Sequence, residues 1–168
     1  MAPSDDSDVE VFDGIAQISV GDVFLVAWRS GATAARIDWV HERVRRHLAR
    51  NADDMVSAQF LLSSATPPGL GEVGSVRAGL RTVLPRARRL VVVPLGDAAW
   101  VSVVRGVMRA GLALPGQSEL IKVAPSAAAA MKLLGDARSP VTPPSEALQL
   151  HLRALLGAVD APSSALPS

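Results

Sequence analysis

Short apolar runs alternate along this chain with longer stretches in which apolar residues recur every three or four positions. Three of the runs are dominated by apolar residues: residues 23–27, 56–62 and 90–93. Continuous apolar runs of this length are typical of strands that are covered on both faces of a sheet. We therefore expect these three strands to be central and nearly fully buried.

Two weaker strand patterns accompany these runs. Residues 9–20 alternate loosely between apolar and polar positions, which predicts an edge strand or an irregular first strand. Gly21-Asp22 is a turn signal, so the strand before it can pair with the following run as a hairpin. A further short strand is predicted at residues 120–123.

Helical periodicity is strongest over residues 33–50. The apolar face of this predicted helix is formed by Ile37, Val40, Val44 and Leu48. Asn51 is expected to end the helix in a left-handed conformation. Further helices are predicted at residues 70–84, 97–114, 127–135 and 145–158.

The order of these elements predicts an α/β protein: a mixed sheet of about five strands with helices packed on it, plus an appended C-terminal helix. Prolines in the segment before the last helix indicate a linker that could detach this helix from the core. The expected organisation is a disordered acidic arm at 1–8, a domain at 9–135, a Pro-rich linker at 136–144, a helix at 145–158 and a disordered tail at 159–168.

Composition excludes several kinds of site. The 168 residues include no cysteine, which rules out disulfides, thiolate metal sites and cysteine nucleophiles. The first residues are acidic and polar, so no signal peptide is expected, and no apolar run approaches the ~18 residues of a membrane span. We expect a cytoplasmic protein.

The formal net charge of +1 is the sum of an acidic N-terminal segment and a basic remainder of the chain. Fifteen of the seventeen cationic residues are arginine, which fits either the codon bias of a GC-rich genome or an anion-binding surface. The chain has three Phe, three Trp and no recognised nucleic-acid motif, so no nucleic-acid partner is expected.

The third apolar run and the residues after it carry a distinctive order. They read Arg88-Arg89-Leu90-Val91-Val92-Val93, then Gly96-Asp97, then Trp100. This order resembles the STAS-like and CRAL-TRIO-like proteins, the sporulation anti-sigma-factor-antagonist fold, and is most similar to their branch of small bacterial proteins. The resemblance extends over residues 9–135. It implies a STAS-like sheet and a protein-interaction module with a regulatory role.

Phospho-regulated members of this group carry an Asp-x-Ser motif at the start of a helix, and a kinase phosphorylates that serine. The corresponding loop here contains the candidate residues Ser63, Ser64 and Thr66, but no Asp precedes them. Two interpretations stay open: a phospho-switch, or polar loop residues that cap the next helix.

No catalytic constellation emerges from the remaining residues. The three histidines, His41, His47 and His151, lack metal-ligand spacing, and packing or solvation is expected for them. We therefore expect no enzyme activity, no cofactor and no metal site.

The predicted helix at 97–114 has more apolar surface than packing by one face requires. Either the last helix covers the excess, or a protein partner or a second copy does. The candidate interaction surface is Trp100, Val104, Arg105, Met108 and Arg109. The alternative function is a small-molecule or lipid-binding protein with a pocket between this helix and the sheet. A cavity lined by Trp100, Met108 and Phe60 would favour that alternative.

Overall fold

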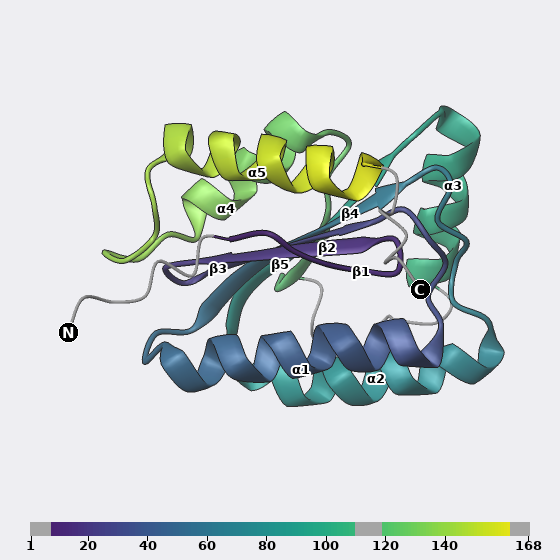
Figure 1. The fold of residues 1–168 in the computed structure, drawn as a ribbon, viewed down its shortest axis with the longest axis horizontal. Helices are drawn as coiled ribbons and strands as arrows, with labels where there is room; N and C mark the ends of the chain where they lie inside the picture. The colour runs from purple at the N-terminus through teal and green to yellow at the C-terminus, as the bar shows by residue number, and fades with distance from the viewer. Residues whose placement is uncertain (1–7, 110–118, 162–168) are drawn as a thin grey trace, which may run out of the picture.

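The computed structural model describes residues 8–109 and 119–161, which fold into a six-stranded sheet between two layers of helices (Figure 1). The strands follow one another across the sheet in chain order. They are β1 (Glu10–Phe12), β2 (Ile15–Val20), β3 (Val23–Trp28), β4 (Met55–Leu62), β5 (Ala87–Leu95) and β6 (Ile121–Val123). The expected mixed α/β sheet is confirmed, with one strand more than the five expected.

The additional strand comes from a tight turn inside the segment expected to be a single strand. Asp13 and Gly14 both have positive φ, of 45° and 79°, and they join β1 to β2 as an antiparallel hairpin. A two-residue Asp-Gly loop is a strong hairpin signal, because glycine tolerates positive φ without strain. β2 and β3 also pair antiparallel, as expected from Gly21-Asp22, whereas β3, β4, β5 and β6 are mutually parallel.

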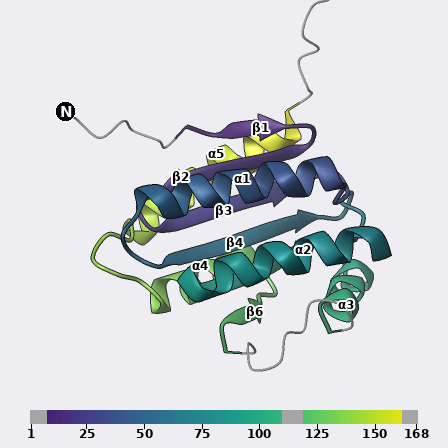
Figure 2. The same cartoon turned by 90° about the horizontal axis from the view of Figure 1, so that it is seen from below.

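Five α-helices are described, and they divide between the two faces of the sheet. They are α1 (Ala34–Arg50), α2 (Leu70–Val83), α3 (Ala98–Val107), α4 (Ala127–Asp136) and α5 (Ser145–Asp160), and a short 3₁₀ turn at Leu84–Arg86 precedes β5. α1 and α2 cover one face and α4 and α5 the other (Figure 1). α3 stands at the end of the sheet toward which the parallel strands point (Figure 2).

Short polar side chains begin three of these helices. Thr33, Asp97 and Ser126 each accept a hydrogen bond from a backbone N–H in the first turn of α1, α3 and α4. The expected left-handed end of α1 is wrong. Asn51 has φ −109° and ψ 128°, and its side-chain amide donates to the carbonyl oxygen of His47 at 2.8 Å. The same carbonyl also accepts the backbone N–H of Asn51 at 3.1 Å, so the helix ends with two donors from one residue and without a left-handed conformation.

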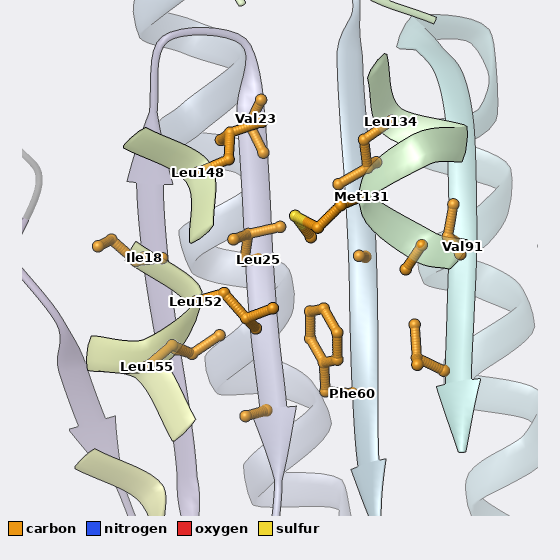
Figure 3. Close-up of a cluster of buried hydrophobic side chains, with 14 of the residues drawn as sticks. Ile18, Val23, Leu25, Phe60, Val91, Met131, Leu134, Leu148, Leu152 and Leu155 are labelled. Atoms are coloured by element: carbon orange, nitrogen blue, oxygen red, sulfur yellow. The ribbon is translucent and has the colours of Figure 1, made fainter. Parts of the chain in front are cut away.

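The last helix is part of the core. Leu148, Leu152 and Leu155 extend from α5 onto β2 and β3, and Phe60 of β4 lies in the same apolar layer (Figure 3). All four are buried, with Leu155 and Phe60 at 0% exposure. The inference that the Pro-rich segment detaches this helix is therefore wrong. The apolar face of α5 is used on the sheet and does not cover α3.

The three strands expected to be central are central. β3, β4 and β5 each have a hydrogen-bonded neighbour on both sides, and all of β3 is buried. Successive side chains along these strands point to opposite faces of the sheet. They therefore contribute to two separate cores, one beneath α4 and α5 and one beneath α1 and α2.

A buried carboxylate joins the amino-terminal ends of these strands to the connection between α4 and α5. Asp22, in the β2–β3 turn, is 0% exposed and accepts hydrogen bonds from Ser139 Oγ at 2.9 Å and Thr142 Oγ1 at 2.8 Å. The guanidinium of Arg88 on β5 pairs with the same carboxylate oxygen and also donates to the carbonyl of Ala137. Asp22 is thus more than a turn residue, because it connects the loop that leads into α5 to the sheet.

Candidate functional site

A cavity of about 210 Å³ lies between the sheet and the three helices α1, α2 and α3. Strand alternation selects the residues of β4 that reach it: Ser57, Gln59 and Leu61 line the cavity. Phe60, between them in sequence, belongs to the core on the opposite face. The cavity therefore has two of the three expected lining residues, Trp100 and Met108, whereas the placement of Phe60 there is wrong.

α3 forms one wall of the cavity. Trp100, Val104, Val107 and Met108 all line it, and Val104 is 4% exposed. The indole N–H of Trp100 donates to the backbone carbonyl of Leu61 at 3.2 Å, which ties the start of α3 to the end of β4. Much of the apolar surface of this helix beyond what packing by one face requires therefore faces the cavity.

A second tryptophan lines the cavity from the sheet. Trp28, at the end of β3, donates its indole N–H to Gln59 Oε1 at 2.8 Å. Since a tryptophan has a single side-chain donor, both cavity tryptophans use that donor within the protein. Both tryptophans therefore present mainly apolar ring surface to the cavity.

One polar atom in the lining has no partner. The Oγ of Ser57 is buried and makes no hydrogen bond, and the residue as a whole is 2% exposed. Its strand neighbours across the sheet are Phe24 and Leu90, which are apolar. A buried hydroxyl without a partner costs about 1–3 kcal/mol, so such a group calls for a physical explanation.

His41 lines the cavity from α1, where α1 and α2 approach closely. A Cβ atom placed on Gly79 of α2 would lie 1.9 Å from His41 Nε2, so a larger residue there would require this ring to move. Burial lowers the pKa of His41, and Arg45 lowers it further, while Asp38 acts in the opposite direction. The imidazole is therefore held toward its neutral form.

His47, one and a half turns further along α1, is a core residue. It is 3% exposed, shares a hydrogen bond with Ser19 Oγ through Nδ1, and packs edge-on against Phe24 with the ring centroids 5.6 Å apart. Burial lowers the pKa of His47, although nearby Asp22 raises it. Serine, imidazole and carboxylate thus gather here, but none of the three lines the cavity. We interpret them as core contacts.

The lowered pKa values of His41 and His47 predict that the stability of the protein depends on pH. The unfolded chain, with histidine pKa values near 6.5, takes up protons that folded His41 and His47 resist. Stability therefore rises with pH in this window. We expect the free energy of unfolding to fall as the pH drops from about 7.5 to about 5.5. Urea unfolding at a series of pH values should show this slope, and His47→Gln should reduce it. Equal slopes for the two proteins would remove His47 from the explanation.

The candidate phospho-loop lies at the carboxyl end of β4. Ser63, Ser64 and Thr66 are all exposed. Ser64 Oγ donates to the carbonyl of Arg29 at 2.8 Å, and Thr66 lines the cavity. None of them caps α2, which begins at Gly69 without a side-chain cap. The capping interpretation is therefore wrong for α2, and the phospho-switch stays a prediction.

The candidate interaction surface divides into two groups. Trp100, Val104 and Met108 line the cavity, whereas Arg105 and Arg109 are exposed. The part of the predicted helix beyond Arg109, residues 110–114, lies outside the described residues. Sequence reasoning missed Ser57 and Gln59, although two polar residues at a spacing of two inside an apolar strand do indicate a distinct face.

Neither a membrane span nor a metal site emerges from the part of the chain that the structure describes. No helix there combines the length and the apolar character needed to cross a bilayer, and no three His, Cys, Asp or Glu side chains gather as possible metal ligands. Compared with protein-family models, curated proteins and solved structures, the chain matches none of them. The STAS-like resemblance therefore rests on the residues between Arg88 and Trp100 and on the order of the elements.

Proposed function

We propose that this protein binds a small, mainly apolar molecule in the cavity between its sheet and α3. The cavity itself carries the proposal, because protein interiors are packed like organic crystals and rarely contain voids larger than a water molecule. A space of about 210 Å³ that is lined mostly by apolar side chains and partly open to solvent exposes apolar surface, which a bound molecule would remove from water.

The position of the cavity also supports a binding role. Trp28 and Leu61 lie at the carboxyl ends of the parallel strands β3 and β4, and the loop with Thr66 follows directly. Loops that follow the carboxyl ends of strands commonly supply binding residues on a rigid scaffold.

A protein-interaction role, which the STAS-like resemblance implies, is the second proposal. One observation favours it: Val103 on α3 is 47% exposed, in a helix that also exposes Arg105 and Arg109. Such a surface suits an acidic partner. Because the opposite side of the same helix lines the cavity, a bound molecule would fix α3 and could control that contact. The proposed protein is then a cytoplasmic regulatory module that responds to a ligand.

Filling the cavity tests ligand binding directly. Val92 of β5 lines the cavity, so Val92→Phe places a ring in the space a ligand would take. Toluene at about ten times its Kd should stabilise the wild-type protein by about 1.4 kcal/mol, a rise in Tm of roughly 3–5 °C. The variant should show less than a third of this rise.

The matched control is Val103→Phe, which adds the same atoms at an exposed position of α3. It should keep the full response to toluene. If Val92→Phe does not fold, Val107→Phe fills the cavity from α3 instead. A wild-type Tm that does not move up to the solubility limit of toluene would refute the proposed function.

A further inference from the structure

The cavity lining has a composition that restricts the charge of its ligand. No Asp, Glu, Lys or Arg is among the described residues that line it. Its one ordinarily titratable side chain is His41, whose ring packs against Gly79. An ionised group taken into such a site would lose its hydration without gaining a counter-charge, which is strongly unfavourable. The lining therefore selects against ionised ligands.

The lining also provides one definite place for a polar group. Among the described lining residues, only Ser57 contributes a buried side-chain atom without a hydrogen-bond partner, and because this Oγ is closed off in the empty protein, the side chains around it must shift when a ligand group pairs with it. The indole N–H groups of Trp28 and Trp100 are already used by Gln59 and Leu61. A serine hydroxyl both donates and accepts, so it can pair with a hydroxyl or an amine of a ligand.

The size of the cavity sets the scale of the ligand. A dry protein cavity of about 150 Å³ binds benzene. The present cavity, at about 210 Å³, has room for a single ring with one or two small substituents. Flat aromatic surface from Trp28 and Trp100 in the lining favours a planar ring, since aromatic pairs gain beyond simple burial.

We infer that the ligand is a neutral single-ring compound with one hydroxyl or amine group, and that this group pairs with Ser57 Oγ. This inference rests on the proposed function, because it specifies what the same cavity takes. Ser57 then acts as a specificity-determining residue. Its unpaired hydroxyl is unfavourable in the empty protein and becomes satisfied when the ligand binds.

The test uses three probes that share one ring: toluene, p-cresol, which adds a hydroxyl, and 4-methylbenzoate, which adds a carboxylate. Calorimetric titration gives the Kd of each for the wild-type protein and for Ser57→Ala. The ratio of the toluene Kd to the p-cresol Kd should fall by roughly tenfold in Ser57→Ala, the value of one hydrogen bond. The Kd for toluene itself should stay the same, and 4-methylbenzoate should not bind either protein detectably.

Two further variants make the result specific to the hydroxyl. Ser57→Thr keeps the hydroxyl and should retain most of the p-cresol preference, and it also serves if Ser57→Ala does not fold. Ser63→Ala, at an exposed position outside the lining, should leave every Kd unchanged.

The possible failures are distinguishable. If toluene binds but the Kd ratio is the same in Ser57→Ala and wild type, the pairing with Ser57 is wrong and the binding cavity stands. If 4-methylbenzoate binds as tightly as p-cresol, the restriction to neutral ligands is wrong. If none of the three probes binds the wild-type protein, the proposed function fails together with this inference.

Discussion

Asp22→Ala is expected to lower the free energy of unfolding by about 3 kcal/mol, because it removes a fully buried carboxylate that forms an ion pair and accepts two hydrogen bonds. The substitution leaves Arg88 without its carboxylate and leaves Ser139 and Thr142 without their acceptor. The connection into α5 loses its attachment to the sheet at the same time. Urea unfolding at pH 7.5 measures the change.

The control for this prediction is a second arginine–carboxylate pair near the same end of the sheet. Asp54 and Arg86 lie 3.0 Å apart, but their side chains are 47% and 39% exposed. Solvent screens such pairs, so Asp54→Ala should cost less than about 1 kcal/mol. If both variants unfold like the wild-type protein, the buried network does not stabilise the fold.

Leu155→Ala should destabilise the protein by about 3 kcal/mol, within the range measured for truncation of fully buried leucines. Leu155 is 0% exposed and packs from α5 onto the sheet (Figure 3). The lost burial and the cavity left behind both contribute. The same helix provides the matched control: Leu150 is 64% exposed, and Leu150→Ala should change stability by less than about 0.5 kcal/mol.

This pair of variants also decides whether α5 belongs to the cooperative unit. If Leu155→Ala cost no more than Leu150→Ala, the helix would be an appendage. Removal of residues 140–168 is expected to unfold the domain, because it also takes away Leu148, Leu152 and Val159, which are buried.

The elements themselves could be predicted from local patterns in the sequence. Runs dominated by apolar residues identified β3, β4 and β5 as central strands, since strands covered on both faces are rich in such residues. Period-3.6 patterns located α1, α2, α4 and α5 to within a few residues. These signals are local, so a single sequence contains them in full.

Which faces of the helices and strands pack against each other could be known only from the tertiary structure. Excess apolar residues on α3 could indicate a partner, a covering helix or a cavity, because hydrophobicity has no direction. In the tertiary structure α5 packs on the other face of the sheet, whereas α3 and β4 both line the cavity. The same holds for Phe60, whose side of the sheet follows from strand register and not from its hydrophobicity.

The sequence by itself determined the fold class, the central strands and the absence of cysteine chemistry. Tertiary structure decided the roles of Asp22, Ser57 and Trp100. Each of these roles arises from residues far apart in the chain: Asp22 meets Thr142, and Trp100 meets Leu61. Ser57 matters because no such partner reaches it. The cost of a buried polar group depends on what surrounds it in space, and local sequence does not contain that information.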